Sequence, residues 1–174
     1  MNESKQKSGR LKIIFEQLVI LSFAILDVND FQNDFDINVK GGIGVLKKYI
    51  SNLKSNKASV LMFSTVATHI GMPFHASISV SKSAVEGLTK SLAAEYAERV
   101  RFNCIAPTIT KTPLAASLLR NEKQIELMEQ RHPLKRILDP EEIASFAAFL
   151  LSEQSSAITG QIFPIDAGLV SIKR

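Results

Sequence analysis

Apolar positions along the chain fall into two patterns, one helical and one strand-like. Residues 34–53 and 78–98 carry apolar side chains at helical spacing, which predicts two long amphipathic helices. Residues 59–63 and 100–106 are short, nearly continuous apolar runs of the kind that forms buried strands. Strands that alternate with helices predict a parallel sheet joined by right-handed crossovers.

The C-terminal third continues this alternation. The sequence Asp139-Pro140-Glu141-Glu142 is a strong helix start, because it supplies a capping side chain, a first-turn proline and carboxylates near the positive end of the dipole. That helix is expected to end near Ser152, and residues 161–165 are expected to form a last strand. Residues 114–130 alternate apolar and charged groups, which fits either a mobile or a helical segment.

The N-terminal part is less informative. Residues 1–10 are polar, and we expect them to be disordered. Within residues 11–33 the run Leu18-Val19-Ile20-Leu21 suits a buried strand or part of an apolar helix, and periodicity does not decide between them. Three glycines, at positions 41, 42 and 44, would weaken the first long helix, so we expect a close packing contact to explain them.

Composition narrows the classes of function. The 174 residues are 45% hydrophobic and 22% charged, which is typical of one globular domain spanning 1–174. The net charge of +4 comes from scattered lysines and arginines, so no nucleic-acid partner is expected. No apolar run reaches the roughly 20 residues of a membrane helix, so we expect no membrane partner and a cytoplasmic location. The single cysteine, Cys104, is assigned to the core, and the three histidines lack metal-ligand spacing.

The stretch 64–82 is where a site is expected. The strand 59–63 delivers two hydroxyls, Ser64 and Thr65, to its carboxyl end, and a loop with Gly71 and Pro73 leads into the next helix. In open α/β sheets, ligands bind in the crevice beyond the carboxyl ends of the strands.

Five groups of residues together resemble the short-chain dehydrogenase/reductase family, in their order and spacing over residues 34–168. They are Asn38-Val39-Lys40-Gly41; Ser64-Thr65 with Ser81-Lys82; Arg101-Phe102-Asn103-Cys104-Ile105-Ala106-Pro107 with Thr112; Asp139-Pro140-Glu141-Glu142-Ile143-Ala144; and Thr159-Gly160-Gln161 with Asp166-Ala167-Gly168. The resemblance implies an α/β fold with a partial Rossmann-like, doubly wound parallel sheet in three α/β/α layers. Residues 34–169 correspond to the short-chain dehydrogenase/reductase (SDR) fold, and the resemblance implies that the chain is truncated at its N-terminus.

The resemblance also implies roles for single residues. Family members use NAD or NADP to interconvert small carbonyl and alcohol compounds, with a tyrosine that exchanges the proton. Asn38 matches a relay asparagine, Lys82 matches the lysine that lowers the tyrosine's pKa and holds the ribose, and Thr65 takes the place of the substrate-binding serine, with Ser64 beside it. Pro107 and Thr112 match positions near the nicotinamide, although Thr108 replaces the glycine that usually follows the proline.

Two departures bear on activity. The tyrosine position, four residues before Lys82, holds Ile78, which cannot exchange a proton. The neighbours Ser77, Ser79 and His75 are candidate substitutes, and His75 has the most suitable reference pKa. The second departure is that no glycine-rich strand–turn–helix of the dinucleotide-binding type occurs in the sequence, so binding of NAD or NADP by this chain is in doubt.

These observations leave three interpretations open. The first is an oxidoreductase of the family, impaired or inactive as this chain. The second is a catalytically silent subunit that forms a homo-oligomer through helices 34–53 and 78–98, and the third is a gene remnant without function. The sequence decides neither the substrate nor the choice between NAD and NADP.

Overall fold

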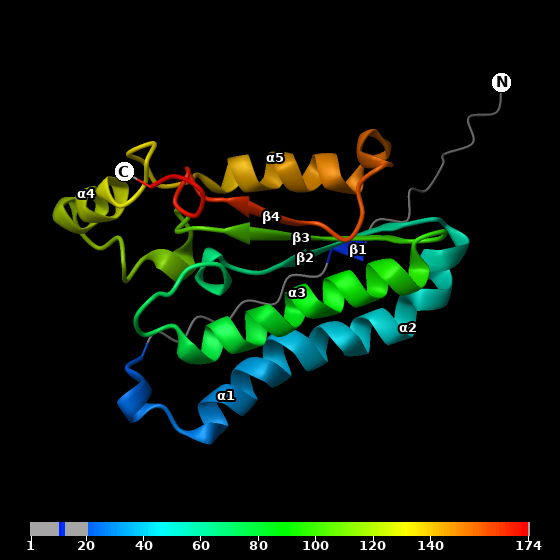
Figure 1. Ribbon diagram of the computed structural model, residues 1–174, viewed down its shortest axis with the longest axis horizontal. Coiled ribbons are helices and arrows are strands. Elements are labelled where there is room, and N and C mark those ends of the chain that lie inside the picture. Colours follow the sequence, from blue (N-terminus) through cyan, green and yellow to red (C-terminus); the bar gives the residue numbers. More distant parts are fainter. Residues whose placement is uncertain (1–10, 13–20, 174) are drawn as a thin grey trace.

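The computed structural model describes residues 11–12 and 21–173. In this part of the chain a parallel sheet has the order β1-β2-β3-β4, formed by β1 (Leu11–Lys12), β2 (Ser59–Phe63), β3 (Arg101–Pro107) and β4 (Ile162–Ile165). The register places Val60 beside Phe102 and Cys104 beside Ile162. The predicted α/β class with a parallel sheet is therefore confirmed (Figure 1).

Helices cover both faces of this sheet, which gives three layers (Figure 1). One face carries α1 (Val28–Phe35), a π-helical turn η2 (Asp36–Lys40), α2 (Gly41–Ser55) and α3 (Ala76–Tyr96). The other face carries α5 (Pro140–Leu151), and α4 (Glu122–Gln130) lies beyond the end toward which β3 and β4 point. Short 3-10 turns complete the fold: η1 (Phe23–Ile25), η3 (Val66–Thr68), η4 (Pro113–Ala115) and η5 (Glu153–Ser155).

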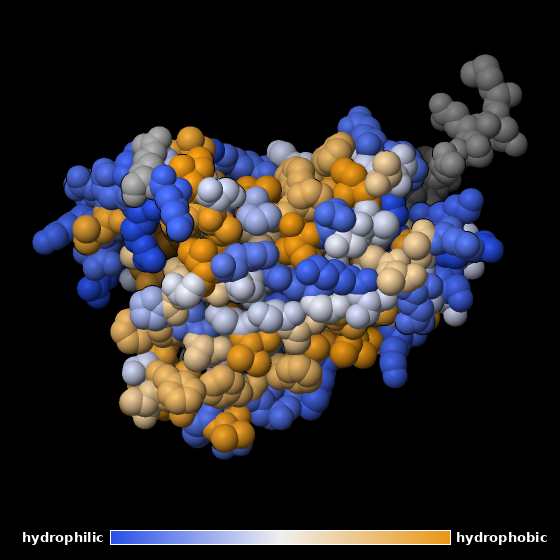
Figure 2. All heavy atoms as spheres, viewed as in Figure 1, coloured by the Kyte–Doolittle hydropathy of each residue, from blue (hydrophilic) through white to orange (hydrophobic). Residues whose placement is uncertain are grey.

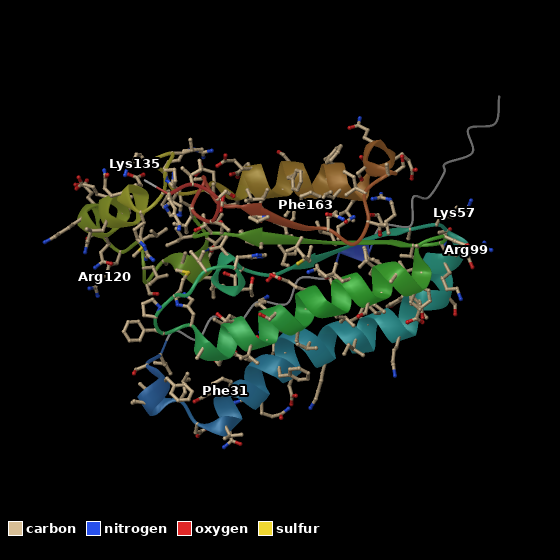
Figure 3. All side chains as sticks on the ribbon, in the orientation of Figure 1. Phe31, Lys57, Arg99, Arg120, Lys135 and Phe163 are labelled. Atoms are coloured by element: carbon tan, nitrogen blue, oxygen red, sulfur yellow. The ribbon has the colours of Figure 1, made fainter. Side chains whose placement is uncertain are left out.

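The core has two halves because side chains alternate along each strand. Val60, Met62, Phe102 and Cys104 face α2 and α3, where they pack with helix residues such as Leu46 and Val85. Leu61, Phe63 and Ile105 face α5 and pack against Ala147 and Leu150. Figure 3 shows Phe163 between β4 and α5, where its ring meets Phe146 edge-on. Cys104 is fully buried, which confirms its assignment to the core, and burial, the largest cause, raises the pKa of its thiol to about 12.

Two element boundaries differ from the sequence prediction. The first long helix begins at Val28, six residues before the predicted start, because Asp27 caps it and Asp30 completes a capping box. Residues 28–33 carry too few apolar side chains to show this helix by periodicity. Residues 114–130 include the last two residues of the turn η4 and all of the helix α4, so the helical alternative holds for Glu122–Gln130. The run Leu18–Ile20 lies outside the described residues, and the described edge strand is Leu11–Lys12.

The packing contact expected at the helix glycines is not found at Gly42 or Gly44. A Cβ atom built at either position meets nothing within 4 Å. The prediction was therefore wrong for these two residues, and their absent side chains relieve no clash.

We expect Gly44→Ala to stabilise the protein by about 0.5–1 kcal/mol, because alanine restricts the unfolded chain and fits the helix without a clash. Urea unfolding followed by circular dichroism measures the change. Gly168→Ala is the matched control: its φ is +89°, and an added Cβ would lie 3.1 Å from a Pro133 side-chain atom, so that variant should be destabilised.

The start of α5 carries an exposed ion pair in which an arginine contacts both oxygens of a carboxylate. Both guanidinium nitrogens of Arg136 lie 2.7 Å from the Glu142 carboxylate, whose oxygen also accepts from the Asp139 backbone N–H at 3.0 Å. Hydrogen bonds from Arg136, followed by that from Asp139, lower the pKa of Glu142 from 4.5 to about 2. The predicted helix start at Asp139-Pro140 is confirmed.

This lowered pKa predicts a pH dependence of stability. Because the folded-state pKa lies below the unfolded one, the contribution of Glu142 is complete above pH 4.5 and declines as the pH falls toward 2. The difference in unfolding midpoint between wild type and Glu142→Gln should therefore shrink between pH 5.5 and pH 2.5. A difference that stays constant across this range would contradict the assignment.

Candidate active site

A cavity of about 400 Å³ opens at the carboxyl ends of β2 and β3, beneath the segment 108–132. Its walls come from the loop and helix that follow β2, from the segment that follows β3, and from Leu169 near the C-terminus. This is the edge at which α/β sheets bind ligands, and it is where the sequence placed the site.

Six of the seven residues singled out from the sequence line this cavity. They are Ser64, Thr65, Ile78, Lys82, Pro107 and Thr112. Asn38 lies behind the wall instead: its side-chain amide donates to the Asp34 carbonyl at 3.0 Å and to Ser81 Oγ at 3.3 Å. The roles given to these residues stay predictions, but the fold brings the six together.

Ile78 presents a buried hydrocarbon side chain to the cavity wall, with 2% of its surface exposed. It lies on α3 one turn before Lys82, whose ammonium group donates to the Phe63 carbonyl at 3.2 Å. The position at which the family pattern requires a phenolic hydroxyl is thus apolar.

The two hydroxyls after β2 have different environments. Ser64 Oγ donates to the carboxylate of Glu86, which also accepts from Thr68 Oγ1 at 2.6 Å and lies 3.3 Å from His69 Nε2. Thr65 Oγ1 caps η3 by accepting from the Ala67 N–H at 3.4 Å, a long bond that leaves its own proton available. Thr65 is therefore the better placed of the two to donate to a ligand. The sequence analysis did not identify Glu86 as a residue of this site. Its position one helical turn after Lys82 could have indicated that it lies on the same face of the helix.

A hydroxyl–histidine pair, Thr108 and His132, also lies in the cavity wall and was not predicted from the sequence. His132 is buried, and the sequence analysis assigned it no role; its Nε2 lies 2.8 Å from Thr108 Oγ1 and its Nδ1 lies 2.7 Å from the Met128 carbonyl oxygen. Both side chains line the cavity. The two residues are 24 positions apart in the sequence, so no local motif could have joined them.

This geometry fixes the tautomer of neutral His132. A carbonyl oxygen only accepts hydrogen bonds, so Nδ1 carries the proton and Nε2 accepts from the Thr108 hydroxyl. We expect long-range ¹H–¹⁵N correlation spectra at pH 8.5 to show the Nδ1–H tautomer for His132. An Nε2–H tautomer would contradict the bond to Met128.

His75, the candidate substitute acid, also lines the cavity. Its Nδ1 lies 2.7 Å from the Pro73 carbonyl oxygen at the start of α3, so the same reasoning leaves its Nε2 unprotonated in the neutral form. Of the other neighbours, Ser77 is buried, and its hydroxyl has no hydrogen-bond partner among residues 11–12 and 21–173. Ser79 Oγ donates to the Ala67 carbonyl at 3.2 Å.

The described residues fit only one end of a nicotinamide dinucleotide. Lys82, Pro107 and Thr112, to which the resemblance assigns contacts with the nicotinamide riboside, all line the cavity. The closest grouping of glycines in the sequence, Gly41, Gly42 and Gly44, lies inside a helix rather than in a turn that could receive a pyrophosphate. A complete dinucleotide site is therefore not formed by the described residues.

Comparison with known proteins places the chain in a family. Residues 1–170 match the family described as enoyl-(acyl carrier protein) reductase. The chain is 35% identical to the oxidoreductase UcpA of Escherichia coli O157:H7 over 180 residues, covering 97% of this chain and 68% of the relative. It thus spans about two thirds of the length of that relative.

Solved structures show the same fold. A short-chain dehydrogenase family protein from Francisella tularensis subsp. tularensis SCHU S4 superposes with a TM-score of 0.88 at 29% identity, covering 94% of this chain and 71% of the other. A 4-hydroxyisoleucine dehydrogenase complexed with NADH gives a TM-score of 0.88 at 24% identity, covering 94% and 69%, which shows the fold alone. In the described residues no helix is long and apolar enough to cross a membrane. The chain belongs to the short-chain dehydrogenase/reductase family of oxidoreductases.

Proposed function

We propose that the cavity of this chain binds a small, mostly apolar carbonyl or alcohol compound, and that its NAD(P)-linked turnover is impaired. We infer the class of reaction from the family and the class of substrate from the side chains that line the cavity. The cavity is walled largely by apolar side chains, including Met72, Phe74, Leu114 and Leu118. Such a wall favours a hydrocarbon body with few polar atoms. A cytoplasmic location is part of the same proposal.

The proposed impairment rests mainly on one observation, the apolar side chain of Ile78 in the cavity wall. Interconversion of a carbonyl and an alcohol requires a proton to join or leave the oxygen, and general acid–base help contributes about 10²- to 10⁴-fold to such a step. A bound nicotinamide would supply or accept hydride. Among this chain's cavity residues, Thr65 is one of the hydroxyls available to the oxygen, but position 78 offers no proton.

Turnover of 2-octanone with NADH or NADPH, followed by absorbance at 340 nm, tests this proposal. Wild type should stay at the uncatalysed rate. Ile78→Tyr should stay there too, since it supplies a phenol without a pyrophosphate site, and Ile78→Phe controls for side-chain size. Wild-type turnover would contradict the impairment, and a large gain in Ile78→Tyr alone would place the whole defect at residue 78.

A second candidate function, a homo-oligomeric subunit, is supported by apolar side chains on the helices of one face. Ile37, Tyr49 and Val80 are each at least 40% exposed on η2, α2 and α3. Figure 2 shows hydrophobic residues gathered on the side of the molecule that α1 occupies in Figure 1. Burying such side chains against a second copy would remove apolar surface from water.

Size-exclusion chromatography with light scattering separates the remaining interpretations. A discrete dimer or tetramer that the double variant Ile37→Glu, Val80→Glu converts to monomer would support the subunit. A wild-type monomer would contradict it, and soluble aggregate alone would favour a remnant without function.

A further inference from the structure

Thr108 and His132 form a hydrogen-bonded pair in the cavity wall to which no role has yet been given. Thr108 stands at the position where the family pattern has a glycine, and a glycine there could not bond to His132. Both side chains are more than nine-tenths buried, yet both line the cavity. The pair is therefore screened from bulk water and accessible to a ligand.

The hydrogen-bonding role of Thr108 depends on the charge of His132. When the imidazole is neutral, its Nδ1–H donates to the Met128 carbonyl and Nε2 accepts from the Thr108 hydroxyl. Thr108 then offers only oxygen lone pairs to the cavity. When the imidazole is protonated, Nε2–H donates to Thr108 Oγ1 instead, which releases the Thr108 O–H to donate elsewhere.

We propose that Thr108 binds the ligand's oxygen atom and that His132, acting through Thr108, sets whether this hydroxyl donates or accepts. Protonated His132 favours a carbonyl ligand, which can only accept a hydrogen bond. Neutral His132 favours an alcohol, which can donate to Thr108. The inference rests on the proposed function in one respect, because it takes the carbonyl and alcohol as the ligand class.

Few polar groups in the cavity wall are available to bind the oxygen atom of a ligand. Ile78 contributes no polar atom, and Ser64 donates to Glu86. The other hydroxyls of the cavity wall are Thr65 after β2 and Thr108, Thr110 and Thr112 after β3, and Thr110 Oγ1 donates to the Thr108 carbonyl at 2.9 Å. Among these hydroxyls, the one of Thr108 is bonded to an imidazole nitrogen, which accepts a hydrogen bond when the ring is neutral and donates one when the ring is protonated.

Other charged groups near the pair come from several segments. Lys82 and His75 line the same cavity, and Arg131, next to His132, lies 3.7 Å from Met128 Sδ through Nη1. Glu129 lies on α4, and the Lys135 ammonium group donates to the Gln130 carbonyl. The Asp166 carboxylate accepts from the Gly168 and Val170 N–H groups, in a turn that lies next to Pro133. Among the side chains that line the cavity, His75 and His132 are the histidines, so His75→Gln is the matched control.

The test is the ratio of affinities for 2-octanone and 2-octanol, measured on the 174-residue chain by ¹H–¹⁵N chemical-shift titration at pH 5.0 and pH 8.5. We expect the preference for the ketone to fall by about 3- to 10-fold as the pH rises, the size of one hydrogen bond. Thr108→Val, which keeps the shape and removes the hydroxyl, should abolish this pH dependence. Thr108→Ser and His75→Gln should retain it, and His132→Gln should lose it.

The His132 imidazole spectrum checks the fold of the Thr108 and His75 variants, since the Nδ1–H tautomer should persist in them, and the backbone ¹H–¹⁵N spectrum checks the fold of His132→Gln. A ratio independent of pH in wild type, an unchanged pH dependence in Thr108→Val, or no binding of either compound would each overturn the inference. Binding of both compounds with a ratio that does not change with pH would overturn this inference alone and leave the proposed function standing, whereas no binding of either compound would overturn both, so the two failures are distinguishable.

Discussion

Replacing Ala115 by tryptophan should lower the affinity for 2-octanone at least 10-fold, the largest change in binding that we expect from a single substitution. Ala115 lies in η4 on the cavity wall and is 6% exposed. An indole at this position would occupy the apolar space that the ligand's hydrocarbon chain needs. Each CH₂ group that remains in water forfeits about 0.8 kcal/mol of transfer free energy.

Ala148→Trp is the control for this prediction. Ala148 is exposed on α5, on the opposite face of the sheet from α3. This variant should bind 2-octanone as wild type does. Equal affinities in wild type, Ala115→Trp and Ala148→Trp would show that the ligand binds elsewhere.

Replacing Asp34 by valine should raise the free energy of unfolding by about 1–3 kcal/mol, the largest stabilisation that we expect. Asp34 lies on α1 with none of its surface exposed, and neither carboxylate oxygen has a hydrogen-bond partner among the described residues. Folding therefore removes this carboxyl group from water without compensation. Valine is close to it in size and needs no partner.

Asp36→Val on the adjoining turn is the matched control. Asp36 is exposed and pairs with Lys40 at 2.6 Å, an exposed ion pair of small expected effect. Urea unfolding should therefore separate the two variants clearly. Unchanged or reduced stability of Asp34→Val would show that the carboxyl group has a partner in solution.

Long periodic elements and local motifs were predictable from the sequence. The strands β2 and β3 and the helices α2, α3 and α5 follow from patterns within about 20 residues, and the short-chain dehydrogenase/reductase motifs located the cavity. Those signals are local because helix and strand periodicity is local. The prediction that close packing explains Gly42 and Gly44 was wrong, because packing depends on neighbouring elements that periodicity does not reveal.

Contacts between distant segments could not be predicted. Thr108 meets His132 across 24 residues, and Ser64 meets Glu86 across 22. Each pair joins segments that pack side by side in the fold but are distant in the sequence, and the exact placement of those segments decides which side chains meet. The burial of Asp34 was hidden for the same reason, since a carboxylate within an amphipathic helix is ordinarily solvated.

The central proposal is that the cavity keeps the family's architecture, while the described residues lack a pyrophosphate site for NAD(P) and position 78 lacks a proton donor. Fluorescence titration of the purified chain with NADH and NADPH, from micromolar to millimolar concentration, tests it most directly. We predict no saturable binding in the micromolar range, because the described residues form no pyrophosphate site. Saturation at micromolar concentration, with a blue-shifted nicotinamide emission, would contradict the claim.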